Sequence, residues 1–166
     1  MKVILDTDIL SMFAKIDELK LLGQLFGKNN LAITPKIMEE ISAPLDYGYS
    51  FPTKVIPYIG VIPLDEDSLS EFQKFLSIRG DLGKGELEAV ALYKTKGYRF
   101  ATNDILAREF GQKEGVTVFS LQSILKSLWK GKLKSKNVVR EIIQRMKKAD
   151  NLEVSKEVEK EIFGEN

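Results

Sequence analysis

The chain contains no cysteine and no histidine, and only one tryptophan among its 166 residues. Without cysteine it can build neither a disulfide framework nor a thiolate metal site. Without histidine it also lacks the commonest general base and metal ligand. Any metal site or general base must therefore be made from carboxylates and water, a ligand set that favours hard cations and phosphate-ester chemistry.

Long apolar runs are also missing. No stretch approaches the roughly 20 residues that span a bilayer, and Asp6 and Asp8 interrupt the short apolar N-terminus, MKVILDTDIL, which is too short for a signal peptide. With 43% hydrophobic and 30% charged residues, the chain has the composition of one soluble domain with a core of ordinary size. We expect a cytoplasmic protein with no membrane partner.

The net charge of +1 hides a strong segregation of charge along the chain. Residues 126–148 carry nine basic side chains and a single acidic one, whereas the segments on either side are net acidic. A stretch this basic is typical of a surface that follows a phosphate backbone. A solvated helix face explains it equally well.

Five short apolar runs, each followed by a helical pattern, predict an α/β protein with a parallel sheet covered by helices on both faces. The expected strands are residues 2–5, 31–34, 60–64, 99–102 and 116–119. From Leu121 the pattern changes to three helices, broken at Gly131 and around Asn151. We expect residues 1–120 to form the α/β unit and residues 121–166 a helical extension of the same domain.

Four short acidic segments stand where a strand meets a helix or where a helix begins. They are Asp6, the pair Glu39 and Glu40, the pair Glu86 and Glu88, and Asp104. Ligands bind at the carboxyl ends of parallel strands, so these groups are expected to converge there. Helix capping or solvation explains each one singly, but several carboxylates together repel one another unless a cation lies between them. The whole set favours a Mg²⁺ or Mn²⁺ site.

The context of these acids resembles the PIN-domain ribonucleases, including the VapC-type toxin nucleases. The resemblance runs over about residues 1–120 and rests on four motifs: strand-D-T-D-x-L at 3–10, I-T-P-x-x-x-E-E-I at 33–41, G-E-x-E-A-x-A-L at 85–92 and T-N-D-x-x-A-R at 102–108. The tail after residue 121 also looks like that of a PIN subgroup. The resemblance implies a three-layer α/β/α fold with a central parallel sheet of four to five strands.

The resemblance also implies roles for individual residues. The catalytic metal ligands would be Asp6, Glu40, Glu88 and Asp104. Glu86 is the alternative to Glu88, two residues earlier. Supporting positions around the site would be Asp8, Glu86, Asn103 and Arg108.

By that resemblance, the reaction would be Mg²⁺- or Mn²⁺-assisted hydrolysis of RNA phosphodiester bonds. Basic residues of the C-terminal part would hold the RNA, namely Lys126, Lys130, Lys132, Lys134 and Arg140. Bases could stack on Tyr47, Tyr49 or Phe51, although packing is the more ordinary role of such aromatic residues. VapC-like proteins further imply a toxin role, a small antitoxin partner and a homodimer.

Two other functions remain open from the sequence. The segment L-D-T-D-I-L imitates the opening of haloacid-dehalogenase phosphatases, in which Asp6 would be the nucleophile and Asp8 the general acid. Leu10 and the lack of a later G-D-x-x-x-D motif argue against it. A catalytically silent PIN fold that binds RNA or a protein is the second alternative.

Overall fold

The computed structural model describes residues 1–164, in which five parallel strands form a sheet with the order β3-β2-β1-β4-β5. The strands are β1 (Val3–Leu5), β2 (Leu31–Ile33), β3 (Gly60–Val61), β4 (Arg99–Ala101) and β5 (Val118–Phe119). Every neighbouring pair is parallel. The predicted α/β class with a parallel sheet of four to five strands is confirmed.

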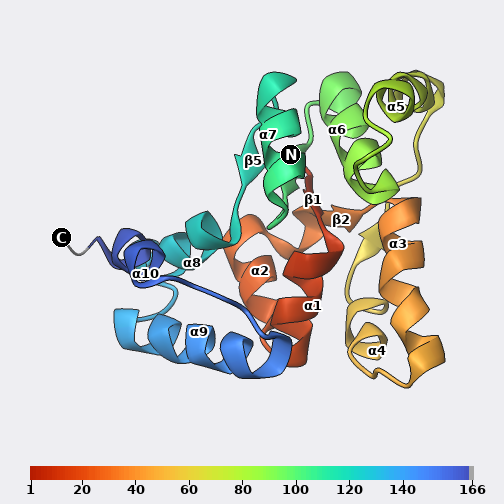
Figure 1. The fold of residues 1–166 in the computed structure, drawn as a ribbon. Helices are drawn as coiled ribbons and strands as arrows, with labels where there is room; N and C mark the ends of the chain where they lie inside the picture. Colours follow the sequence, from red (N-terminus) through yellow and green to blue (C-terminus); the bar gives the residue numbers. More distant parts are fainter. Residues whose placement is uncertain (165–166) are drawn as a thin grey trace.

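Helices cover both faces of this sheet (Figure 1). One group packs below the sheet in that view: α1 (Thr7–Lys15), α2 (Leu19–Phe26), α3 (Pro35–Ser42) and α4 (Pro52–Val55), with the 3-10 turns η1 (Lys28–Asn30) and η2 (Ala43–Tyr47). The group above it is α5 (Glu66–Ile78), α6 (Lys84–Lys96) and α7 (Ile105–Lys113). This placement follows from right-handed crossovers, because the chain reverses its direction across the sheet after β3.

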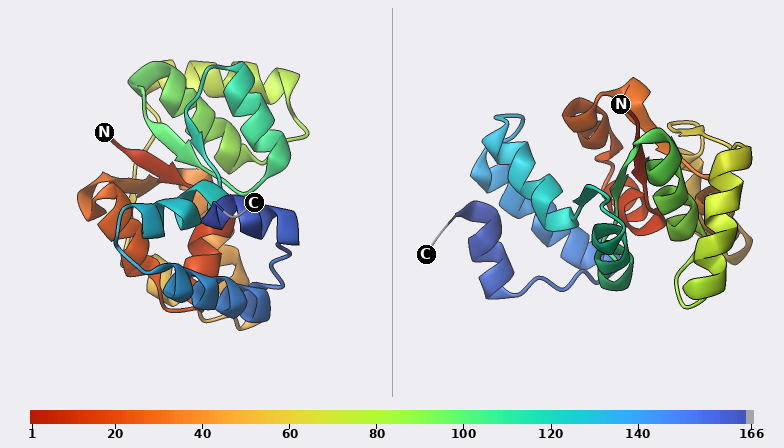
Figure 2. Two further views of the ribbon diagram at one scale, coloured as in Figure 1. Left: turned by 90° about the vertical axis from the view of Figure 1, so that its left-hand side faces the viewer. Right: turned by 90° about the horizontal axis from the view of Figure 1, so that it is seen from above.

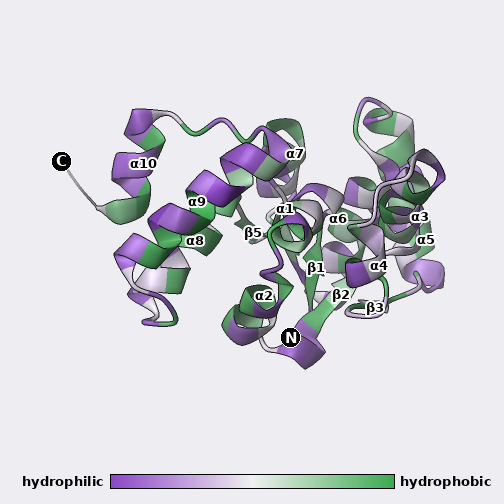
Figure 3. Ribbon diagram, turned by 90° about the horizontal axis from the view of Figure 1, so that it is seen from below, coloured by the Kyte–Doolittle hydropathy of each residue, from purple (hydrophilic) through white to green (hydrophobic). Residues whose placement is uncertain are grey.

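Three C-terminal helices stand together beside the sheet (Figure 2). They are α8 (Leu121–Lys130), α9 (Lys136–Asp150) and α10 (Lys156–Phe163), broken near Gly131 and Asn151 as the sequence predicted. In Figure 3, α9 is hydrophilic on one side and hydrophobic on the other. Its buried residues join the same hydrophobic core as those of the strands and of α1.

One element boundary agrees with the sequence analysis and one differs from it. Asp6 is the N-cap of α1 and accepts a hydrogen bond from the Thr7 amide, so the helix capping that the sequence left open for Asp6 is present. The last strand is shorter than residues 116–119, because the Val116 amide donates to the Gly111 carbonyl in the turn after α7.

Among residues 1–164, no helix is both long and apolar enough to cross a membrane.

Candidate functional site

Strands β1 and β4 lie side by side at the centre of the sheet, and each ends in a polar segment. Asp6 follows β1 and is only 4% exposed. Its Oδ1 accepts from the Thr7 amide at 2.7 Å, and its Oδ2 accepts from the Thr102 hydroxyl, also at 2.7 Å. These two hydrogen bonds fix the orientation of the Asp6 carboxylate at the carboxyl end of the sheet.

Thr102 also joins Asp6 to Asp104. Its oxygen accepts from the Asp104 amide at 3.1 Å while its hydroxyl donates to Asp6. The Asp104 side chain caps α7, with Oδ1 accepting from the Ala107 amide at 2.7 Å. Thr102 belongs to one of the four sequence motifs, but the sequence assigned it no role. Its complete burial is the structural feature that marks it as part of the site.

Glu40 reaches the same region from α3, which follows the neighbouring strand β2. Its Oε2 accepts from the Thr7 hydroxyl at 2.8 Å. The first turn of α6 passes close to this carboxylate: a Cβ built on Gly85 would lie 3.2 and 3.3 Å from the two Glu40 oxygens. A glycine at position 85 therefore lets α6 begin beside Glu40.

Glu86 lies in this first turn of α6, and its Oε2 accepts from the Gly83 amide at 2.8 Å. Burial raises the pKa of the Glu86 carboxyl to about 8, and the negative charges of Asp6, Asp104 and Glu40 contribute to this rise. Glu86 therefore shares the negative electrostatic environment of these three carboxylates.

The pKa of Asp6 is raised as well, to about 7. Burial is the largest cause, and the charges of Asp8 and Glu40 add to it, while the hydrogen bonds from Thr102 and Thr7 oppose it. The charged side chains that act on Asp6 are thus all acidic. Such a site favours either retained protons or a bound cation.

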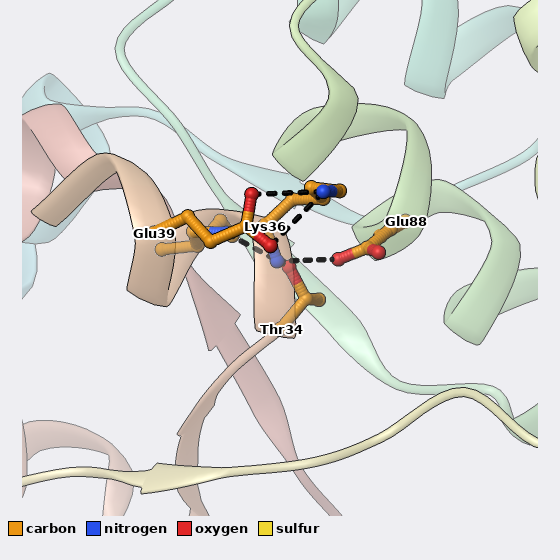
Figure 4. A network of polar contacts seen from close by, with 5 residues as sticks. Thr34, Lys36, Glu39 and Glu88 are labelled. Atoms are coloured by element: carbon orange, nitrogen blue, oxygen red, sulfur yellow. Dashed lines mark hydrogen bonds and ion pairs between the residues drawn. The ribbon is translucent and has the colours of Figure 1, made fainter.

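Glu88 is hydrogen-bonded to the start of α3 (Figure 4). It is buried at 5% exposure, and its Oε2 accepts from the Lys36 backbone amide at 3.0 Å. Glu39 is paired with the Lys36 ammonium at 2.8 Å. The charges of Asp6, Glu40 and Asp104 thus act on Glu86, whereas Glu88 holds the first turn of α3.

Asp8 extends the acidic region towards α9. Its pKa is raised by burial and by the charges of Asp150 and Asp104, and lowered by Lys15. Asp150 accepts a hydrogen bond from Ser11 and is paired with Lys15. No local sequence signal marks Asp150, because only the packing of α9 on α1 brings it here.

Asn103 and Arg108 lie on the other side of Asp104 and line a cavity of about 180 Å³ between α7, α8 and the segment after α9. Arg108 Nη1 is 3.5 Å from Gln122 Oε1. Arg108, which the resemblance placed among the supporting positions, thus contacts an amide on α8.

The basic residues expected to hold RNA lie on the C-terminal helices. Lys126 and Lys130 are on α8, which runs away from the sheet, and Lys132 and Lys134 follow in the turn before α9 (Figure 1). The Arg140 guanidinium stacks 4.1 Å from the centre of the Phe163 ring. This group therefore lies along the C-terminal helices, which stand beside the sheet.

The donor chemistry of the cluster fits a hard divalent cation. Asp6, Glu40, Glu86 and Asp104 offer only oxygen, and burial and like charge disfavour the ionised forms of Asp6 and Glu86. Within residues 1–164, however, no group of three or more acidic side chains is already arranged to hold a metal ion. The carboxylates would have to move to close a ligand shell.

The structure is thus that of an α/β domain whose parallel sheet carries an acidic cluster at its carboxyl edge. A family model described as a PIN domain matches residues 2–165. The chain therefore belongs to the PIN-domain family. No curated protein matches it by sequence.

Membership of this family confirms the coarser predictions from the sequence. PIN domains are typically nucleases, which supports a hydrolase that acts on nucleic acids, and they generally use divalent metal ions. The VapC-type subgroup stays a prediction.

Proposed function

We propose that the protein is a Mg²⁺- or Mn²⁺-dependent endoribonuclease whose acidic set is Asp6, Glu40, Glu86 and Asp104. The observation that carries the proposal is a set of hydrogen bonds at one edge of the sheet in a PIN domain: Thr102 joins Asp6 to Asp104, and Thr7 joins Asp6 to Glu40. The charges of Asp6, Asp104 and Glu40 also act on Glu86. Glu86 replaces Glu88 in this set, because Glu88 accepts its hydrogen bond from the Lys36 amide.

The four carboxylates would hold the cation, which when bound would polarise the phosphoryl group of RNA and lower the pKa of a water molecule. The protein's own contribution is to orient the ligands. Thr102 and Thr7 hold Asp6, and the Ala107 amide holds Asp104. Such hydrogen bonds to metal ligands typically matter ten- to hundredfold for affinity or activity.

The test is cleavage of a fluorescently labelled single-stranded RNA with Mg²⁺ or Mn²⁺ and with EDTA. Asp6→Asn and Asp104→Asn should abolish metal-dependent cleavage, since each removes a charge and keeps a hydrogen-bond acceptor. Asp46→Asn, at an exposed position of η2, is the matched control and should cleave normally. Full activity in both site variants would refute the proposal.

The sequence left two other functions open, a phosphatase and a catalytically silent PIN fold. The haloacid-dehalogenase phosphatase loses its support, because the chain belongs to the PIN-domain family. A catalytically silent PIN fold that binds RNA or protein would show no metal-dependent cleavage in the same assay.

The toxin role, an antitoxin partner and a homodimer rest on the resemblance to VapC-type proteins and stay predictions. Growth arrest on expression of the wild type, but not of Asp104→Asn, would support the toxin role. Light scattering after size-exclusion chromatography would report the oligomeric state.

A further inference from the structure

Two neighbouring cavities lie along α8, and the lining of the first includes Asn103 and Ile105, the residues on either side of Asp104 in the chain. The first, about 180 Å³, is enclosed by α7, α8, α10 and the segment between α9 and α10, which runs back past α7 (Figure 2). The second, about 280 Å³, lies further along α8 and includes Lys126. Gln122 and Ile162 line both cavities, so the two are neighbours.

The lining of the first cavity has the chemistry of a nucleobase site. Aliphatic side chains, among them Leu125 and Ile162, offer an apolar surface to a flat ring. Arg108 and Gln122 offer hydrogen-bond donors and an amide acceptor at its rim. Ligand sites commonly combine such apolar walls with a few convergent polar groups.

Glu153, which also lines the first cavity, would distinguish a base from a backbone phosphate. Its carboxylate would repel a backbone phosphate in the first cavity, whereas carboxylates accept hydrogen bonds from the amino groups of bases. The first cavity is therefore suited to a base rather than to a phosphate.

The position of the first cavity ties it to the proposed reaction. Asn103, which lines it, directly precedes Asp104 in the chain. Arg108 lies one turn further along α7, and its amide donates to the Asp104 carbonyl at 3.1 Å. A base in this cavity would lie next to a phosphodiester at the acidic cluster.

The second cavity leads towards the lysine side chains of α8. Gln122, Lys126 and Lys130 are spaced four residues apart on α8 and so share one face of the helix. Lys126 shares the second cavity with Glu161, whereas Lys130 is exposed beyond it, 5.9 Å from the Trp129 ring. The face leads from the acidic cluster outwards along the basic part of the chain.

We propose that the first cavity, here called the base pocket, seats one base of a single-stranded RNA next to the bond to be cut, and that the RNA backbone continues along Lys126 and Lys130. The proposal rests on the proposed ribonuclease function and adds a substrate subsite to it. It accounts for Arg108 and Gln122, which the acidic cluster does not use.

The test compares two labelled ligands of equal length and charge: a single-stranded RNA and the same sugar–phosphate backbone without bases. Fluorescence anisotropy in EDTA gives both affinities in the absence of cleavage. The wild type should bind the RNA about tenfold more tightly than the abasic backbone, the effect of about one hydrogen bond to a charged group. Repulsion by the acidic cluster affects both ligands equally.

Two variants address the base pocket without changing its charge. Gln122→Leu removes the amide, and Arg108→Lys removes the planar guanidinium. Each should lower the preference for RNA over the abasic backbone several-fold. Gln112→Leu, at an exposed position on the far end of α7, is the matched control and should keep the preference.

Lys126→Gln tests whether the RNA backbone passes along α8. It should weaken both ligands by the same factor and reduce the salt dependence of binding, as expected for a phosphate contact. Lys113→Gln, at the exposed end of α7, should leave both affinities unchanged.

Equal affinity of the wild type for the two ligands, or an unchanged preference in both Gln122→Leu and Arg108→Lys, would overturn the base pocket. Base-dependent binding without metal-dependent cleavage would instead refute the ribonuclease and leave the pocket standing. Cleavage without base-dependent binding would refute the pocket alone.

Discussion

Burial and like charge act together on Asp6 and Glu86, the two carboxyl groups with the largest upward shifts of pKa in the cluster. Burial is the leading cause for both, and each also contributes to the negative environment of the cluster. Their ionised forms are therefore unfavourable until a cation arrives. Metal binding at such a site is expected to release protons and to strengthen as the pH rises.

The first prediction concerns the pH dependence of stability without metal. The folded pKa of Asp6, about 7, lies above its ordinary value of 3.8, so the folded state keeps a proton that the unfolded chain has released. The stabilisation is complete below pH 4 and is lost as the pH rises towards 7, by at most about 1.4 kcal/mol per pH unit. The raised pKa of Glu86 extends the loss towards pH 8.

Urea denaturation in EDTA between pH 5 and 8 measures this effect. The free energy of unfolding of the wild type should fall across the range, and Asp6→Asn should fall less. Added Mg²⁺ should stabilise the wild type more at pH 8 than at pH 6. A wild type whose unfolding free energy does not change with pH would contradict the prediction.

The second prediction separates Glu86 from Glu88. Glu86→Gln removes a carboxylate on which the charges of Asp6 and Asp104 act and which is proposed to hold the cation. Metal-dependent cleavage should therefore fall by more than about a hundredfold, beyond the usual loss for a supporting residue. Its melting temperature should stay the same or rise, since a like charge is removed.

Glu88→Gln should behave in the opposite way. It weakens the hydrogen bond from the Lys36 amide at the start of α3, at a cost of about 1 kcal/mol in stability. RNA cleavage should remain within a few-fold of wild type. The reverse pattern of activities would return Glu88 to the metal site.

At the scale of elements, the contact between α3 and α6 shapes the site. The Lys36 amide at the start of α3 donates to Glu88 of α6, and Gly85 of α6 lies against Ile37 and Glu40 of α3. The two helices therefore fix one another at the point from which Glu40 and Glu86 reach the cluster. A shift of either helix would separate these carboxylates.

The third prediction tests this contact with Gly85→Ala. The added Cβ would lie 2.6 Å from Ile37 Cγ1, so the helices must move apart. Stability should fall by about 1–3 kcal/mol, the usual cost of overpacking, and cleavage should fall with it. Gly60→Ala in β3 has open space around the new Cβ and should be nearly neutral in a thermal melt.

If the Gly85→Ala and Gly60→Ala variants had the same melting temperature and cleaved RNA at the same rate, the close approach of α3 and α6 would not matter for the site.

The same helix shows where sequence reasoning succeeds and where it stops. Hydrophobic periodicity predicted the three C-terminal helices, because these signals are local. Glu86 and Glu88 were expected where a helix begins, and α6 does begin there, at Lys84 after its N-cap Gly83. Glu86 and Glu88 are about 200° apart around a helix. Which of them faces Asp6 depends on the tertiary position of α6, which the sequence alone does not give.

At the scale of the whole molecule, the C-terminal helices complete the region around the acidic cluster. Asp150 at the end of α9 acts on Asp8, and Gln122 of α8 contacts Arg108. Leu152 and Val154 close one side of the base pocket. Arrangements like these could not be predicted from the sequence, because the partners lie far apart in the chain.

The fourth prediction is that the C-terminal helices unfold together with the sheet. The buried residues of α8, α9 and α10 belong to the same core as the strands. Trp129, the only tryptophan, lies on α8 and donates to the Ile162 carbonyl at 2.9 Å, so its fluorescence reports on this part of the molecule. Far-ultraviolet circular dichroism reports on all helices. The two urea transitions should coincide.

Phe163→Ala sharpens the same test. Phe163 is 2% exposed and stacks on Arg140, so its truncation should lower the free energy of unfolding by about 3–5 kcal/mol and the melting temperature by about 10 °C. In a single cooperative unit, both optical signals shift by the same amount. Leu133→Ala, in the exposed turn before α9, should shift neither by much. A tryptophan transition that moved while the dichroism stayed in place would show that the C-terminal helices unfold separately.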